Sequence, residues 1–449
     1  MNETICALAT APGGAIGIIR ISGPQSLEIL SHVFRGKGNV KSYPANTIHY
    51  GHIVEYDAVS QHPSPIDEVL VSIFHAPHSY TGEDSVEISC HGSRYILNKV
   101  LELLTEKGCR QAGPGEFTQR AYLNGKMDLS QAEAVADLIA STNQATHKIA
   151  MSQLRGHFSS RLAQLREQLL KLTSLLELEL DFSDHEDLEF ADRSELKQLT
   201  QTIYSHIAHL SHSFETGQAL KQGIPVAIVG KTNVGKSTLL NRLLKDDRAI
   251  VSAIHGTTRD TIEDTIDIHG ITFRFIDTAG IRQTSDEVEQ IGITRTYAAI
   301  EKARIVLWLI DSEPSQEEIN DMQHRCEGKS LIIIQNKIDK NIGDFAEIKI
   351  SAKMGEGIDT LENAIYKAAD IPELLENDVI VTNARHYEAL TRAQESIQRV
   401  VDGLQMQLSE DLLSEDLRQA LDTLSEITGG QITPNEVLGN IFKNFCVGK

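Results

Sequence analysis

Residues 230–237 read GKTNVGKS, and this stretch decides the fold of the middle of the chain. It matches the pattern G-x-x-x-x-G-K-[ST] and lies between the apolar run IPVAIVG and the helical pattern TLLNRLL. In such a strand–loop–helix unit the glycines let backbone N–H groups approach phosphates, Lys236 reaches the β and γ oxygens, and Ser237 can bind Mg²⁺. The stretch therefore predicts a phosphate-binding loop in an α/β domain.

Apolar runs on the C-terminal side of this loop predict a sheet. ITFRFID, RIVLWLID and LIIIQNK are almost continuously apolar, which is typical of parallel strands covered on both faces. We expect residues 219–375 to form a Ras-like P-loop GTPase domain with a parallel-rich sheet and flanking helices.

Two short motifs indicate the base. NKID at 336–339 follows a predicted strand, and SAK occupies 351–353. In the Asn-Lys-x-Asp pattern of GTPases, Asp339 accepts two donors from the guanine edge, Asn336 supports the loop, and SAK adds a backbone contact. Adenine lacks those donors and would leave the buried carboxylate unpaired, which costs several kcal/mol. GTP is therefore the expected nucleotide.

The hydrolytic residues depart from the Ras pattern. DTAG at 277–280 places Asp277 as a Mg²⁺-associated carboxylate, and HGTTRD at 255–260 supplies Thr258 as a second ligand. Ras-like GTPases have a water-orienting glutamine directly after DTAG, whereas this chain has Ile281. Another group must orient the water, and the following stretch offers Arg282, Asp286, Glu287 and Glu289.

Composition limits the other functions. The formal charge is −21, with 63 acidic against 42 basic residues, so a broad nucleic-acid-binding surface is not expected. The five cysteines are odd in number and lack CxxC spacing, which fits a reducing cytosol. No signal peptide pattern or long apolar run occurs, so we expect a soluble cytoplasmic protein without membrane attachment.

The pattern of apolar residues changes along the chain and predicts an α/β multidomain protein with four segments. Residues 1–120 alternate short apolar runs with a helical pattern, as in an α/β domain. Residues 121–218 and 376–449 carry long helical periodicity, and 219–375 lie between them. One discontinuous all-α domain into which the GTPase domain is inserted is the economical topology, although two separate bundles would look similar.

The motifs together resemble one family. NVGKS, GTTRD, DTAGIRQTSDEVEQIGI, NKID, PGEFTQRAYLNGK and the terminal CVGK all occur in this chain, which resembles the MnmE (TrmE) family of tRNA modification GTPases over its whole length. The resemblance implies a GTPase that K⁺ activates and that dimerises through its G domains. The implied GTP-binding residues are Asn233, Val234, Gly235, Lys236, Ser237, Thr238, Ser252, Ala253, Ile254, His255, Gly256, Thr257, Thr258, Asp277, Thr278, Ala279, Gly280, Asn336, Lys337, Asp339, Ser351, Ala352 and Lys353.

The resemblance also assigns the ions and the catalytic groups. Asn233 would bind K⁺ with backbone groups near Ser252, Ile254 and Thr257, so that the ion supplies the charge of a missing arginine finger. Glu289 would orient water, and it forms the predicted catalytic set with Lys236 and Arg282. Mg²⁺ would be held by Ser237, Thr258 and Asp277.

For residues 1–120 the resemblance implies a tetrahydrofolate-binding fold that also forms a homodimer. Arg20, Glu87, Lys126 and Lys449 match the folate contacts, for 5-formyl- or methylene-tetrahydrofolate. The family's C-terminal tail folds back toward this pocket, which would place Cys446 near the folate. Whether this thiol reacts, binds or only packs stays open.

The expected function is GTP-driven tRNA modification. With an FAD-dependent partner of the MnmG (GidA) family, the protein would add a carboxymethylaminomethyl or aminomethyl group at carbon 5 of the wobble uridine of tRNA. A ribosome-assembly GTPase is one rival, but the chain lacks a basic RNA-binding appendix. A dynamin-like GTPase is another, but no amphipathic membrane tip is evident.

Overall fold

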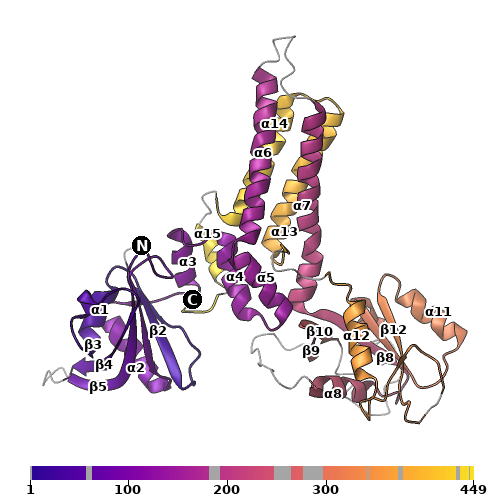
Figure 1. The fold of residues 1–449 in the computed structure, drawn as a ribbon, viewed down its shortest axis with the longest axis horizontal. Coiled ribbons are helices and arrows are strands. Elements are labelled where there is room, and N and C mark those ends of the chain that lie inside the picture. The colour runs from indigo at the N-terminus through magenta and orange to yellow at the C-terminus, as the bar shows by residue number, and fades with distance from the viewer. Residues whose placement is uncertain are drawn as a thin grey trace. The chain divides into compact units, whose positions relative to one another are not determined.

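The computed structural model describes residues 3–56, 63–181, 193–246, 264–276, 297–340, 343–372, 378–430, 435–443 and 445–448 (Figure 1). The chain divides into two compact units. Unit 1 contains residues 1–139, 153–184 and 410–449, and unit 2 contains residues 140–152 and 185–409. Each unit thus combines segments that are far apart in sequence. The predicted boundaries after residues 120, 218 and 375 stay a prediction.

Unit 1 contains a seven-stranded sheet in the order β3-β4-β5-β6-β2-β1-β7. Adjacent strands are antiparallel except for β1 and β7, which are parallel. Helices α1 (Ser26–Val33) and α2 (Arg94–Glu106) pack on the sheet and bury its apolar side chains. The strands are β1 (Ile5–Leu8), β2 (Ile16–Ser22), β3 (Phe34–Gly36), β4 (Thr47–Tyr56), β5 (Pro63–Phe74), β6 (Ser85–His91) and β7 (Arg110–Gln111).

Alternation along the strands decides which side chains are buried. Ile19, Ile21 and Ile88 are fully buried, because every second residue faces the covering helices. The remaining elements of unit 1 are helical. They are the 3₁₀ helix η1 (Val40–Ser42), α3 (Glu116–Leu123), α4 (Leu129–Ala140), α6 (His157–Asp181), α14 (Glu410–Thr428) and α15 (Asn435–Phe442).

Two long helices of unit 1 come from opposite ends of the helical region. Helix α6 packs along α14 (Figure 1). Arg418 on α14 forms an ion pair with Glu177 on α6 at 3.2 Å. Near the C-terminus, α15 buries Leu438 and Phe442 against Leu129 of α4. The amphipathic periodicity of these segments is therefore satisfied by helix-on-helix packing.

Unit 2 contains a six-stranded sheet in the order β13-β12-β11-β8-β10-β9. Five of these strands are parallel to their neighbours, and the edge strand β9 is antiparallel to β10. The strands are β8 (Ile224–Gly230), β9 (Asp264–Ile268), β10 (Ile271–Phe275), β11 (Ile305–Ile310), β12 (Ser330–Gln335) and β13 (Ile348–Lys349). The helices of this unit are α5 (Gln144–Leu154), α7 (Arg193–Gln222), α8 (Lys236–Asp246), α11 (Gln316–Arg325), α12 (Ile358–Ala368) and α13 (Ala384–Gln405).

The helices on either side of the sheet segment pack together. α7 precedes β8 and α13 follows α12, yet the two helices pack against each other (Figure 1). The rings of Phe214 and Tyr387 stack with centroids 4.3 Å apart. Ser213 Oγ also accepts a hydrogen bond from the Val381 N–H at 3.1 Å. The sheet is therefore inserted between two helical segments that meet in space, and the predicted mixed α/β multidomain fold is confirmed. Within the described residues, no helix combines the length and apolar character needed to cross a bilayer.

Candidate functional site

The loop between β8 and α8 has the geometry of a phosphate-binding loop. Gly230 and Gly235 have φ angles of 150° and 108°, which lie in a region that favours glycine. A Cβ atom on Gly230 would collide with the Leu309 carbonyl oxygen, and one on Gly235 would collide with the Asn336 side-chain amide. The loop backbone can therefore pass this close to its neighbours only with glycine at both positions.

Lys236 begins α8, and its side chain folds back over the loop. Its Nζ donates to the carbonyl oxygens of Gly230 at 2.7 Å and Lys231 at 2.8 Å. Burial lowers the pKa of Lys236 below the usual lysine value. A phosphate at the N-terminus of α8 would favour the charged form of this amine, because the opposite charge offsets its desolvation.

Asn336 joins the phosphate loop to the loop predicted to contact the base. It is only 2% exposed, and its Nδ2 donates to the Val234 carbonyl at 2.8 Å. Its Oδ1 accepts from the Ala352 N–H at 3.0 Å. One buried side chain thus fixes three predicted motifs, GKTNVGKS, NKID and SAK, relative to each other.

The other predicted base-binding residues lie around this amide. Ser351 Oγ donates to Asp339 Oδ1 at 2.8 Å, which orients the carboxylate. Lys337 has a φ of 64° and forms an ion pair with Asp311 at 2.7 Å. The carbonyl oxygen of Lys353 accepts from Arg242 at 2.8 Å. These residues come together because parallel strands β8, β11 and β12 end at the same edge of the sheet.

Two of the residues predicted to bind ions, Ser237 and Asn233, lie in the described part of the chain. Ser237 is half-buried in the first turn of α8, and Thr238 beside it is exposed. Asn233 lies in the phosphate loop, where it has a φ of 61° and an exposed side-chain amide. A hydroxyl and an amide oxygen fit Mg²⁺ and K⁺, respectively, as hard oxygen donors. The following predicted residues lie outside the described part of the chain: Ser252, Ala253, Ile254, His255, Gly256, Thr257, Thr258, Asp277, Thr278, Ala279, Gly280, Arg282 and Glu289.

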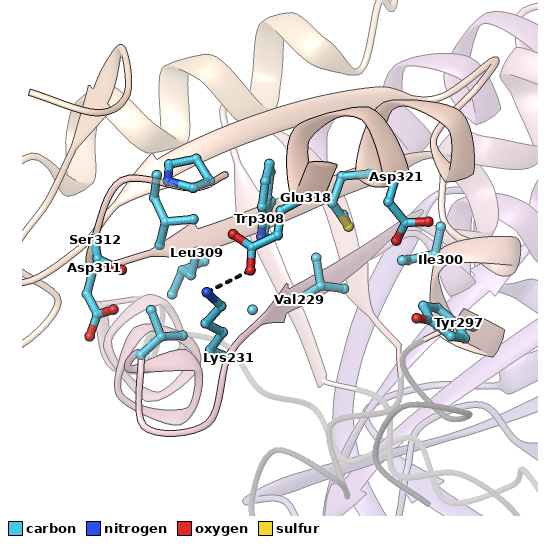
Figure 2. A pocket seen from close by; sticks show the side chains of 15 residues that line it. Val229, Lys231, Tyr297, Ile300, Trp308, Leu309, Asp311, Ser312, Glu318 and Asp321 are labelled. Atoms are coloured by element: carbon cyan, nitrogen blue, oxygen red, sulfur yellow. Dashed lines mark ion pairs between the residues drawn. The ribbon is translucent and has the colours of Figure 1, made fainter. Parts of the chain in front are cut away.

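A cavity of about 260 Å³ lies next to the phosphate loop, on the side of α11. Figure 2 shows its apolar lining, which includes Val229, Ile300 and Trp308, the single tryptophan of the chain. Lys231 and Glu318 form an ion pair of 2.7 Å at this cavity. The predicted base-binding residues do not line it, so this cavity is adjacent to the nucleotide site but is not the base pocket.

In unit 1, two predicted folate contacts face each other on neighbouring strands. Arg20 on β2 is paired in register with Glu87 on β6. Arg20 donates from Nε at 3.0 Å and from a terminal nitrogen at 2.7 Å to the same Glu87 oxygen. The rings of Tyr80 and Phe117 lie 5.4 and 5.7 Å from this guanidinium. Lys126, the third predicted contact, donates to the Pro77 carbonyl at 2.9 Å.

The C-terminal tail lies beside this arginine. Val447 forms an antiparallel bridge with Pro114, and the Gly115 N–H donates to the Cys446 carbonyl at 3.3 Å. Arg20 donates to the Gly448 carbonyl at 3.4 Å. The Cys446 side chain is exposed, whereas Lys449 lies outside the described residues.

Some residues of these two sites were not predicted. Tyr80 and Phe117 flank Arg20, although Phe117 belongs to PGEFTQRAYLNGK, one of the motifs of the family resemblance. Arg242 and Asp311 hold the SAK and NKID loops but belong to no motif. A charged residue on α8 or at the end of a strand is a weak signal for a role in the nucleotide site, because many charged residues at such positions contact only water.

Two family models match most of this chain. The family model described as GTP-binding protein TrmE N-terminus matches residues 4–126, and the model described as MnmE helical domain matches residues 129–446. The chain is 55% identical to the tRNA modification GTPase MnmE of Phocaeicola vulgatus, over all of this chain and 99% of that protein. It is 54% identical to the protein of the same name in Bacteroides thetaiotaomicron, over the full length of both.

Among solved structures, the G domain of the T. maritima FeoB iron transporter is 23% identical, with a TM-score of 0.25. That alignment covers 33% of this chain and 99% of the FeoB domain, and a score this low supports no argument about this chain. The two family models and the full-length relatives show the family directly, and this chain belongs to the MnmE (TrmE) family of tRNA modification GTPases.

Proposed function

We propose that this GTPase of tRNA modification is activated by K⁺ and acts with an FAD-dependent partner of the MnmG (GidA) type. Together they would add a carboxymethylaminomethyl or aminomethyl group to carbon 5 of the wobble uridine, in the cytoplasm. The observation that carries the GTPase part is the Asn336 network, which brings GKTNVGKS, NKID and SAK to one site. The family membership supports the tRNA part.

Recognition of guanine is proposed for Asp339. Ser351 occupies one of its carboxylate oxygens, which leaves the exposed carboxylate oriented toward donors of the base edge. Asn336 and Arg242 hold the backbone of Ala352 and Lys353, so the SAK loop would already be in place when the base binds. This preorganisation favours GTP over ATP, since adenine cannot supply the two donors.

Hydrolysis is proposed to use Lys236 and Glu289. Lys236 would exchange its two carbonyl partners for the β and γ oxygens, and Glu289 would orient the attacking water, with Arg282 near the phosphates. When bound, Mg²⁺ neutralises charge on those oxygens, and its proposed ligands are Ser237, Thr258 and Asp277.

Potassium is proposed to replace an arginine finger. When bound, it supplies positive charge where charge develops on the transferred phosphoryl group. The exposed amide of Asn233 in the phosphate loop supports this assignment. The other proposed ligands are the backbone groups near Ser252, Ile254 and Thr257.

We assign folate binding and homodimerisation to residues 1–120. When bound, 5-formyl- or methylene-tetrahydrofolate supplies the one-carbon unit. Arg20 and Lys126 carry charges that suit its carboxylate or formyl oxygens, and Glu87 can accept from pterin N–H groups. The Arg20–Glu87 pair is partly exposed, at 20% and 28%, so both side chains can reach a ligand. Lys449 and Cys446 would approach from the tail that lies beside Arg20.

An open face of the unit 1 sheet supports the homodimer. Ile48 and Tyr50 on β4 and Leu70 on β5 are 66%, 58% and 48% exposed. Tyr50 and Leu70 are opposite each other in register, so these side chains form one apolar area. A second copy of the chain would remove this area from water.

The test is mass spectrometry of wobble-uridine nucleosides in tRNA from a strain that lacks this gene. We expect wild type to restore the modified nucleoside, and we expect purified protein to hydrolyse GTP faster in KCl than in NaCl. Unchanged wobble uridine in the deletion strain would refute the tRNA part. Equal rates in KCl and NaCl would refute the potassium part, and complementation with Cys446→Ser would show whether the thiol is needed.

A further inference from the structure

Helix α5 is part of the core of unit 2, although it lies about 70 residues before the sheet in sequence. Ala145 and Ile149 on α5 are 6% and 5% exposed, and they belong to the same apolar cluster as Ile266, Ile268 and Ile271. These three isoleucines are on the β9–β10 hairpin. The helix therefore packs directly on this hairpin.

The N-terminus of α5 holds the turn end of the hairpin by two hydrogen bonds. Asn143, 9% exposed, donates from Nδ2 to Thr272 Oγ1 at 2.7 Å. The Ala145 N–H donates to the Gly270 carbonyl at 3.0 Å. Asn143 Oδ1 accepts from the Thr146 N–H at 2.8 Å, so the same side chain also caps the helix.

A third contact fixes the turn from its other side. His269, with a φ of 53°, hydrogen-bonds through Nε2 to Asn363 Oδ1 on α12 at 3.0 Å, and its ring packs edge-on against Tyr366. The hairpin turn is thus attached to two helices. Rigid attachment of this kind determines where both strands of the hairpin end.

The hairpin lies between the two segments proposed to act on the γ-phosphate. Residues 247–263, which contain Thr258, lead into β9, and residues 277–296, which contain Asp277, follow β10 after Ile276. A shift of the hairpin would therefore move the attachment points of Thr258 and Asp277, two of the three proposed Mg²⁺ ligands, together. Lys236 begins α8, and Asn336 and Asp339 follow β12, so these residues belong to other elements.

We infer that Asn143 and Thr272 are positioning residues for GTP hydrolysis, because their hydrogen bond attaches the β9–β10 hairpin to α5. The inference rests on the proposed hydrolytic role of Thr258 and Asp277. Loss of the hydrogen bond between Asn143 and Thr272 should therefore lower kcat and leave the affinity for the nucleotide unchanged.

The first test is Thr272→Val in the full-length protein. The change removes the acceptor of the Asn143 amide and keeps the side-chain shape. We expect kcat for GTP hydrolysis to fall about fivefold, the change that corresponds to one net hydrogen bond, with KM for GTP unchanged. Thr272→Ser keeps the hydroxyl and should restore the wild-type kcat.

Thr265→Val is the matched control. Thr265 is an exposed threonine on β9 of the same hairpin, so this change has the same chemistry without the contact to α5. Equal kcat for the two valine variants would overturn the inference. A higher KM with unchanged kcat would overturn it as well. So would a loss of kcat that is fully explained by the fraction of the Thr272→Val protein that is unfolded at the assay temperature.

Asn143→Ser provides a second route to the same hydrogen bond. Serine keeps an N-cap acceptor for α5 but is too short to reach Thr272. We expect the same loss of kcat, and no further loss when it is combined with Thr272→Val; additive losses would overturn the inference. A wild-type protein without GTPase activity would instead refute the proposed function.

Discussion

Asn336→Ala is the sharpest test of how the nucleotide site is held together. The wild-type amide donates to the Val234 carbonyl and accepts from the Ala352 N–H, and it is 2% exposed. Alanine removes both interactions and leaves two backbone groups without a partner. The phosphate loop and the base-side loop then lose the side chain that connects them.

The magnitude follows from these two hydrogen bonds. Each orphaned buried group costs about 1–2 kcal/mol, so the free energy of unfolding should fall by about 2–4 kcal/mol. Because both groups belong to loops that would contact GTP, we expect about 2–3 kcal/mol to appear as weaker binding. This corresponds to about a 30- to 150-fold higher Kd for GTP.

Gln335→Ala separates loop positioning from general stability. Gln335 is fully buried and also makes two backbone hydrogen bonds, to the Gly343 carbonyl at 2.7 Å and from the Phe345 N–H at 2.9 Å. Those partners are outside the nucleotide loops. Both variants should therefore lose similar stability, but only Asn336→Ala should lose affinity.

The assay is titration with a fluorescent GTP analogue, together with thermal unfolding of each variant. An equal loss of affinity in Gln335→Ala would refute the reasoning, because the effect would then come from destabilisation of the whole unit. Wild-type affinity in Asn336→Ala would refute it as well.

Three further predictions concern unit 1. Arg20→Ala should weaken 5-formyltetrahydrofolate binding about tenfold or more in calorimetry without changing GTP turnover; unchanged folate affinity would contradict the proposed site. Brief iodoacetamide treatment should label Cys446 first, since the other four thiols are buried, and peptide mapping that finds another cysteine first would contradict this. Burial raises the pKa of Glu116, but hydrogen bonds from Arg110, a backbone N–H and Arg120 outweigh it and leave the pKa below its ordinary value. This carboxylate therefore stabilises the fold above its unfolded pKa of 4.5, and the stabilisation is lost as pH falls through the lower folded value. Glu116→Gln should cost stability near neutral pH and progressively less in acid, measured by urea unfolding; a difference independent of pH would contradict the assignment.

Much of the nucleotide site could be predicted because it follows a local rule. GKTNVGKS and NKID each come directly after an apolar strand, and parallel strands end at one edge of the sheet. The motif predicts that Asn336 supports the loop, and in the structure its side chain hydrogen-bonds to the backbone of Val234 and Ala352.

The position of α5 could not be predicted in this way. Its sequence, QATHKIAMSQL, has the same three- and four-residue periodicity as the helices around it. Periodicity indicates which face of a helix is buried, but it does not identify the surface that covers that face. The contacts of Asn143 with Thr272, and of Arg20 with Tyr80 and Phe117, depend on long-range packing that no local pattern records.

The pairing of α7 with α13 has a mechanical consequence. The chain enters the sheet region at the end of α7 and leaves it just before α13, and these two connections lie side by side, since Gln218 donates to the Thr382 carbonyl at 3.0 Å. A body held by one covalent connection can swivel freely about it. Two hydrogen-bonded connections cannot twist around each other without breaking that contact. The inserted sheet should therefore resist rotation about the axis along which the two connections run.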